Sequence, residues 1–348
     1  MALRRSLVLT VAATAALVLL LALSMWSSER GGSGHPPASG MKIYAAGSGE
    51  DMMSDPSTAR EIVHLAGKAT PHLVYLGTAT YDAPKSEHHQ TKRFVELGCT
   101  VTPIKMARHH PDMTAVRREM EKADIVLVSG GNTLYAVDRW KALGVDRLIH
   151  EAGRRGAVLA GGSAGGIVWF DGGHSDSMDP TTYIDPPGPL LKSSLSKDVL
   201  SKSWAYIRVP GLSLLPGLFC PHYDKVEGNG ELRAKSFTTM MQMHSGETGI
   251  AIDNWAAIVV EGDKYRVVSR KGKPGSAAPG GHYQKPHSQS GGKPGAFVIE
   301  IGPDGRQKRH ALPKSGSLGE LGAHARYITG SPFLHPARVQ NPVPKKDH

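Results

Sequence analysis

From Met41 onward, short apolar runs of strand length alternate with stretches of helical periodicity, and this alternation limits the possible folds more than any other feature. Such chains form parallel sheets, because a helix crosses over the sheet between one strand and the next. The strand-like runs are 42–46, 72–76, 100–104, 125–128 and 157–160, and the helical stretches between and after them are 58–66, 87–97, 113–122, 133–142 and 145–154. The sequence therefore predicts an α/β fold, a mostly parallel sheet sandwiched by helices.

The segment from Ala157 to Phe170, AVLAGGSAGGIVWF, has the pattern of a nucleophile elbow. Gly161-Gly162 ends the apolar run, Ser163 follows, and small residues open an expected helix that runs to Phe170. A sharp strand-to-helix turn needs neighbours without bulk, and the first N–H groups of the helix then face the reacting oxygen. A glycine-rich turn with a structural serine, or a phosphate cradle, is the alternative interpretation of this pattern.

A second glycine-rich turn, Ser129-Gly130-Gly131-Asn132-Thr133, follows an expected strand and opens an expected helix. Active sites of open α/β sheets lie beyond the carboxyl ends of the strands. The N–H groups of this turn would then point into the same crevice as Ser163. An ordinary turn with Asn132 as the helix N-cap explains the segment equally well.

Two later segments contain further polar residues that are candidates for a catalytic role. A glycine-rich stretch over 171–180, expected to be a loop, holds three carboxylates and one histidine. Pro221-His222-Tyr223 comes directly after strand-like residues at 212–220, and short strands are expected at 250–253, 256–261, 265–269 and 297–301. A lone histidine past a strand end is more often a surface or capping residue than a catalytic one.

In this order and spacing, four segments resemble peptidase family S51, the group of peptidase E and cyanophycinase. They are Ser129 to Thr133, Gly162 to Gly165, Pro221 to Tyr223, and the late strand pair from Gly249 to Val259. The resemblance implies a serine peptidase fold of the class I glutamine amidotransferase type, with neither a metal nor an organic cofactor. It implies a peptide substrate, with aspartyl dipeptides or β-aspartyl, cyanophycin-like peptides among the open choices.

The resemblance also assigns roles to residues. Ser163 would be the nucleophile and His222 the general base, with the N–H groups of Gly131 and Ala164 forming the oxyanion hole. Asp176 is the expected acid, because Ser175-Asp176-Ser177 resembles the acid-bearing turn of the family, and Asp179 is the reserve candidate. Asn132 and Arg233 would contact the substrate, although Arg233 is equally explained as a surface arginine of the helix expected over 231–243.

Two other functions share part of this pattern. An α/β-hydrolase esterase also has the G-x-S-x-G turn and the chain order Ser, Asp, His. Such an esterase normally places its acid much further along the chain and carries a His-Gly-Gly loop, which this sequence lacks. A non-catalytic binding domain of amidotransferase-like fold would keep the sheet without needing Ser163 and His222.

The charge and residue composition indicate which kinds of molecule the protein is expected to bind. The formal net charge is +10, but much of the excess lies in peripheral segments, and no basic stripe is interleaved with aromatic residues. We therefore expect no nucleic-acid partner. The histidines and cysteines show no zinc-site spacing, and Cys99 and Cys220 lie in apolar runs, as buried free thiols do.

The two ends of the chain differ from the domain between them. Residues 1–26 pair Arg4-Arg5 with an uncharged apolar run, which favours an uncleaved membrane anchor with its amino end in the cytoplasm. A cleaved signal peptide is the second interpretation, and translation from Met41 would instead give a cytoplasmic protein. We expect a Gly/Ser/Pro linker at 27–40, the peptidase domain at 41–330 with a disordered loop at 271–295, and a Pro-rich tail at 331–348.

Overall fold

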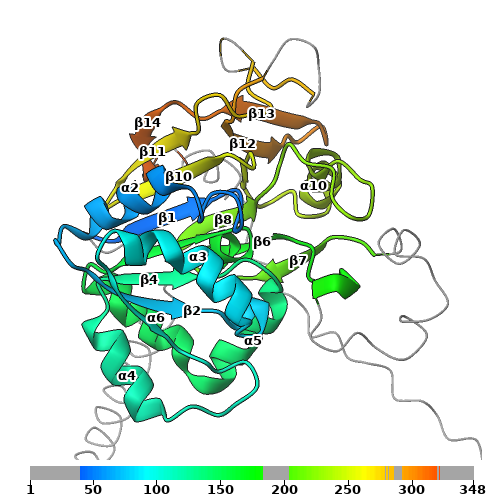
Figure 1. Cartoon of the computed structure of the whole chain (residues 1–348). Helices are drawn as coiled ribbons and strands as arrows, with labels where there is room; N and C mark the ends of the chain where they lie inside the picture. Colours follow the sequence, from blue (N-terminus) through cyan, green and yellow to red (C-terminus); the bar gives the residue numbers. More distant parts are fainter. Residues whose placement is uncertain are drawn as a thin grey trace, which may run out of the picture. The chain divides into compact units, whose positions relative to one another are not determined.

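The structure is a computed structural model that describes residues 40–182, 204–278, 280, 282–285, 292–319 and 321. Its first sheet holds the parallel strands expected from the sequence, β1 (Lys42–Ala46), β2 (His72–Leu76), β3 (Thr100–Pro103), β4 (Ile125–Val128) and β5 (Val158–Gly162). Antiparallel strands β10 (Ala256–Glu261), β11 (Lys264–Ser269) and β14 (Ser315–Ser317) extend it beyond β1. The strand order is β14-β11-β10-β1-β5-β4-β2-β3, so the elbow strand β5 is central (Figure 1).

A second sheet, which the sequence did not predict, contains β6 (Phe170–Ser175), β7 (Ile207–Pro210), β8 (Leu215–Cys220), β9 (Gly249–Ile252), β12 (Ala296–Ile301) and β13 (Gln307–Ala311). Its order is β13-β12-β9-β8-β6-β7. Strand β6 replaces the first half of the loop expected at 171–180. Its glycines allow close contact with neighbouring backbone, since a Cβ on Gly173 would lie 2.4 Å from the Phe219 carbonyl oxygen.

Helices cover both faces of the first sheet, as expected. Helices α2 (Pro56–Ala66) and α3 (Pro84–Glu96) pack on one face through the fully buried Ile62 and Phe94. Helices α4 (Met113–Lys122), α5 (Thr133–Leu143) and α6 (Val145–Arg154) cover the other face, where the fully buried Trp140 lies. Apolar residues of the second sheet complete this larger core. The α/β sandwich predicted from the sequence is therefore confirmed, with a second sheet added.

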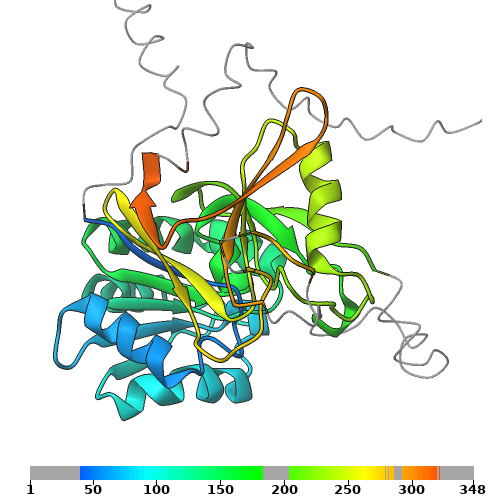
Figure 2. The ribbon, with the colours of Figure 1, turned by 90° about the horizontal axis from the view of Figure 1, so that it is seen from above.

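Helix α10 (Arg233–Met243) covers the second sheet through Phe237 and Met241, and Figure 2 shows this helix beside the strands that it covers. The elbow helix α7 (Ala164–Ile167) is short and ends before Phe170, where strand β6 begins. The chain thus passes directly from the first sheet into the second through the elbow.

The described part of 271–295 is held in place, although its composition predicted disorder. The Asp253 carboxylate accepts hydrogen bonds from Ser276 N at 2.7 Å, Ser276 Oγ at 2.6 Å and Gly295 N at 2.9 Å. Burial, together with the nearby Asp224 carboxylate, raises the pKa of Asp253 to about 7. A low-complexity segment has little apolar surface to bury, but here two backbone N–H groups and the Ser276 hydroxyl donate to a buried acid.

The expected anchor or signal at 1–26, the linker up to residue 39 and the tail at 331–348 lie outside the described residues. Within the described ranges, no helix combines the length and apolar character needed to cross a membrane.

Candidate active site

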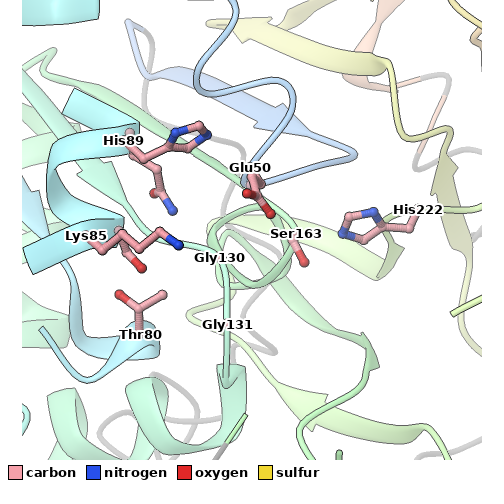
Figure 3. Close-up of a pocket in the computed structure, with 11 residues that line it drawn as sticks. Glu50, Thr80, Lys85, His89, Gly130, Gly131, Ser163 and His222 are labelled. Carbon is pink, nitrogen blue, oxygen red and sulfur yellow. The ribbon is translucent and has the colours of Figure 1, made fainter. Parts of the chain in front are cut away.

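Ser163 occupies the sharp turn between β5 and α7. Its φ of 56° and ψ of −119° are unusual for a residue with a side chain, as expected of a nucleophile elbow. The turn is held from both sides, since Ser163 N donates to Ala46 O at 3.1 Å and Ser163 O accepts from Gly166 N and Ile167 N. The predicted elbow is therefore present, and its serine lines a pocket (Figure 3).

The turn after β4 borders the same pocket through Gly130 and Gly131. Gly131 has a φ of 113°, and a Cβ there would lie 2.3 Å from Ala79 O, so only glycine fits. In the described part of the chain, no acceptor is hydrogen-bonded to the Gly131 N–H. The Ala164 N–H is the first of helix α7 and has no acceptor within the helix. Both N–H groups are thus available in the regions that the sequence predicted for an oxyanion hole.

His222 lines the pocket as well, and Figure 3 shows its ring beside Ser163. It follows β8 with a φ of 47°, and its N–H donates to Gly47 O at 3.0 Å in the loop after β1. The structure therefore brings His222 and Ser163 together from two different sheets. His222 is a pocket residue, whereas a lone histidine at such a position is usually a surface or capping residue.

The partner of the His222 ring is Asn254, whose Oδ1 lies 2.7 Å from His222 Nδ1. Asn254 Nδ2 donates to Asp51 Oδ2 at 2.7 Å. A carboxylate can only accept, so this bond orients the amide with Oδ1 toward the ring. His222 Nδ1 must then carry the proton, which leaves the Nε2 lone pair as the basic site.

Carboxylates lie near this histidine without a hydrogen bond to its ring. Glu227 Oε1 lies 3.7 Å from His222 Nδ1, and Asp51 is separated from the ring by the Asn254 amide. Asp224 Oδ1 accepts from Asn254 N at 2.7 Å, so it holds the backbone that carries the amide. Negative charge therefore lies near the Nδ1 atom of the ring. Sequence reasoning missed Asn254, because this residue falls between two of the expected short strands and only acids were considered as partners of the histidine.

Asp176, the expected acid, lies elsewhere. Its Oδ2 is 3.5 Å from Nη1 of the fully buried Arg233, and Arg233 Nη2 donates to His174 O at 2.7 Å. The reserve candidate Asp179 accepts from Thr181 N and Thr181 Oγ1, both at 2.8 Å. This corrects the expected pairing of Asp176 with His222. The physical reason is that residues 170–175 form a strand, which carries Asp176 to α10 instead of the ring.

Neither expected substrate contact lines the pocket. Asn132 caps α5, because its Oδ1 accepts from Tyr135 N at 3.0 Å and its Nδ2 donates to Ser177 O at 3.2 Å. Arg233 is fully buried at the start of α10 instead of lying on the surface. Its Nη1 and Nε atoms make no hydrogen bond among the described residues. The substrate roles of Asn132 and Arg233 stay predictions.

The pocket has a volume of about 400 Å³ and reaches from His222 across the glycine turns to helix α3. Its lining residues are Gly49, Glu50, Thr80, Lys85, Ser86, His89, Gln90, Gly130, Gly131, Ser163 and His222. The α3 residues carried no sequence motif, so only the structure identifies them. In the part of the chain that is described, no three His, Cys, Asp or Glu side chains are grouped to hold a metal ion.

Comparison with known proteins shows which family this chain matches. The model of peptidase family S51 matches residues 43–268. An uncharacterized peptidase, YgaJ, of Bacillus subtilis is 30% identical over 185 residues, which cover 53% of this chain and 69% of that protein. A Trypanosoma brucei brucei protein named G2/mitotic-specific cyclin-1 is 28% identical over 266 residues, covering 67% of this chain and 76% of the other.

A solved structure has the same fold. The crystal structure of a peptidase from an acI-B1 actinobacterium superposes with a TM-score of 0.50 at 16% identity, covering 80% of this chain and 98% of that one. At this identity, the likeness concerns the fold alone.

Proposed function

Because this chain belongs to peptidase family S51 and is a serine peptidase, we propose that it hydrolyses short peptides with Ser163 as nucleophile and His222 as general base. One observation carries this proposal: the strained Ser163 shares a pocket with a histidine whose Nδ1 is held by Asn254. An esterase or a non-catalytic domain is less well supported, because the family is one of peptidases.

In the proposed reaction, Ser163 Oγ attacks the peptide carbonyl carbon while His222 Nε2 takes the hydroxyl proton. The carbonyl oxygen becomes negatively charged, and the N–H groups of Gly131 and Ala164 donate to it. The protonated ring then gives its proton to the leaving amine, and an acyl group remains on Ser163. Water, deprotonated by the same ring, releases the acyl group and restores the serine.

We assign the orientation of the base to Asn254, in place of an acid bonded to the ring. The amide holds the productive tautomer, as the triad carboxylate does elsewhere. It carries no net charge, so the imidazolium that forms during attack must be stabilised by Asp51 and Glu227 at longer range. This arrangement separates two tasks that a single triad acid usually combines.

The substrate class rests on the resemblance to peptidase E and cyanophycinase. We propose aspartyl dipeptides or β-aspartyl peptides, because a pocket of about 400 Å³ suits a short peptide. From the apolar run after Arg4-Arg5, we further propose that residues 1–26 anchor the chain in a membrane or direct its export.

The test combines labelling and turnover with the full-length chain. A fluorophosphonate should label wild-type protein at Ser163, and Ser163→Ala should lose both the label and at least about a thousandfold of peptide turnover. Because a hydroxyl is replaced by hydrogen in a buried turn, near-UV circular dichroism should match wild type. Retained turnover within about tenfold would overturn the assignment. Turnover of ester substrates without turnover of any dipeptide would favour the esterase.

A further inference from the structure

We infer that Asp82, which does not line the pocket, is a positioning residue that holds the oxyanion hole in its working geometry. It acts through the turn at residues 77–82, which follows β2, on the N–H group of Gly131. This inference rests on the proposed function, in which that N–H group donates to the charged carbonyl oxygen. No sequence motif points to Asp82.

The Gly130-Gly131 turn cannot set the direction of its own N–H groups. Glycine has more backbone freedom than any other residue, and two glycines are adjacent here. A larger residue cannot replace Gly131, since a Cβ there would lie 2.3 Å from Ala79 O. An oxyanion hole works because its donors are already fixed when the charge develops. The rigidity of this turn must therefore come from neighbouring segments.

The turn at 77–82 is one of these neighbours. Asn132 N donates to Ala79 O at 2.8 Å, and this bond fixes the peptide group on the carboxyl side of Gly131. Thr80 lines the pocket beside Gly131, and its Cγ2 would lie 3.2 Å from a Cβ on that glycine (Figure 3). Because Ala79 and Thr80 restrict the backbone of Gly131, a shift of these two residues would change the direction of its N–H group.

The turn at 77–82 has a strained backbone of its own. Tyr81 has a φ of 54° and a ψ of 36°, and Asp82 has a φ of 58°, so two consecutive residues with side chains are left-handed. Among the described residues, only three others with a side chain have a positive φ, and two of these are Ser163 and His222. Such conformations cost free energy and persist only where the surrounding structure enforces them.

The Asp82 carboxylate provides this enforcement. Its Oδ2 accepts hydrogen bonds from Met106 N and Ala107 N, both at 2.7 Å. Bonds to a charged acceptor are stronger than bonds between neutral groups. The two bonds tie the strained turn to a segment more than twenty residues later in the chain, so the position of the turn depends on this one side chain.

Helix α5 holds the other end of this connection. Arg139 Nε donates to Met106 O at 2.8 Å, and Tyr135 Oη donates to Ala107 O. Both donors belong to α5, the helix that begins directly after Asn132. The contacts therefore form a closed ring from α5 through Asp82 and Ala79 back to the start of α5. The oxyanion turn lies at the point where this ring closes.

The experiment compares Asp82→Ala and Asp82→Asn in the full-length chain, with Asp-Leu as substrate and a fluorophosphonate as label. Both rates are expressed per serine that the label finally modifies, so unfolded protein does not count. Asp82→Ala should lower kcat at least about thirtyfold and change KM less than about threefold, because a displaced donor binds the oxyanion poorly and the substrate normally. The rate constant of labelling should fall at least about tenfold for the same reason.

Two variants separate this effect from a general loss of fold. Asp82→Asn keeps an oxygen that can accept both bonds, and Oδ1, which its NH₂ group replaces, makes no hydrogen bond among the described residues. Its kcat should stay within about fivefold of wild type. Asp124→Ala is the matched control and should change neither rate, because Asp124 Oδ2 accepts from His72 N at 3.0 Å at the amino end of β2, outside the pocket.

A change in kcat below about threefold in Asp82→Ala, or an equal loss in Asp82→Asn, would overturn the inference. If Asp82→Ala does not fold, Asp82→Glu replaces it, since an extra methylene group displaces the acceptor and keeps the charge. Its kcat should then fall at least about tenfold, and a wild-type kcat in Asp82→Glu would overturn the inference.

Hydrogen exchange separates this inference from the proposed function. The bond to Ala79 O protects the Asn132 N–H, so Asp82→Ala should speed its exchange at least about tenfold, measured by mass spectrometry, and Asp82→Asn should not. If wild-type protein neither reacts with a fluorophosphonate nor cleaves a peptide, the proposed function fails while this exchange rate still decides whether Asp82 holds the turn. Unchanged exchange in Asp82→Ala would overturn the inference even in an active peptidase.

Discussion

Two histidines, His174 in strand β6 and His222 just after strand β8, have opposite surroundings. His174 lies within β6, is fully buried, and stacks on the Tyr206 ring with centroids 4.2 Å apart. Burial, with the Arg233 guanidinium beside it, holds the pKa of His174 well below its ordinary value. His222 instead lines the pocket and has Glu227 and, through Asn254, Asp51 as its charged neighbours.

The difference in charged neighbours indicates which of the two histidines is better placed to accept a proton. A general base must become a cation during the reaction, and a neighbouring cation in a buried site makes that cost prohibitive. The charged groups described beside His222 are the carboxylates of Glu227 and, through Asn254, Asp51. Asp176 neutralises the Arg233 guanidinium beside His174 and is therefore not available to His222. This contrast supports the proposal that His222, and not His174, is the general base.

Replacing each histidine should give the largest contrast. His222→Gln should lower kcat at least about a thousandfold, because no group then takes the serine proton. His174→Gln should change kcat less than about threefold per folded molecule. Steady-state peptide hydrolysis, normalised to the folded fraction from near-UV circular dichroism, measures both. A comparable loss in both variants would mean that the two histidines act together.

Removal of the ring's partner should have the next largest effect. Asn254→Ala should lower kcat about a hundredfold with KM little changed, since the ring loses its fixed tautomer. Asn254→Asp alone would place a second carboxylate against Asp51. The double variant Asp51→Asn/Asn254→Asp restores one acid and one amide, and so it should recover most of kcat. A loss below about fivefold in Asn254→Ala would show that the amide does not orient the base.

Neutralising Asp176 should affect stability more than turnover. Asp176→Asn leaves the buried Arg233 without its counter-charge, which should lower the free energy of unfolding by about 2 kcal/mol. The value of kcat should fall less than about tenfold. Denaturant titration and peptide hydrolysis on the same preparation measure the two effects. A loss of a hundredfold or more in kcat would return the acid's role to Asp176.

The smallest expected effect concerns pH and the buried Asp253. Its pKa is raised to about 7 in the folded protein, whereas an unfolded aspartate titrates near about 3.9. Between these values the folded state binds a proton that the unfolded state does not, so stability should fall as pH rises from 4 to 7. We expect a loss of roughly 1 to 2 kcal/mol between pH 5 and 7.

Asp253→Asn mimics the protonated acid and should flatten that profile, measured by urea unfolding at several pH values. The neighbouring Asp224 also has a raised pKa because it is buried, so a residual slope from Asp224 should persist. An unchanged slope in Asp253→Asn would assign the pH dependence to other groups.

Sequence patterns predicted what local geometry determines. Strand β4 has the predicted bounds, and the elbow at Ser163 was predicted because apolar runs and glycines have direct conformational consequences. The second sheet was missed, since the glycines of β6 have the composition of a loop. Asn254 was missed for another reason: its role depends on Asp51, about two hundred residues earlier, and no local pattern encodes that bond.

The loop after β1 contacts His222, Asn254 and both glycine turns of the site, and this has a consequence for biosynthesis. Gly47 O accepts from His222 N, Asp51 accepts from Asn254, and a Cβ on Gly49 would lie 2.9 Å from both Gly130 Cα and Gly162 O. The ribosome makes this loop among the first parts of the domain, yet its last partner is residue 254. A nascent chain can therefore carry Ser163 and His222 before residue 254 is present. If the proposed roles hold, we expect peptidase activity to begin only after residue 254 has joined this loop.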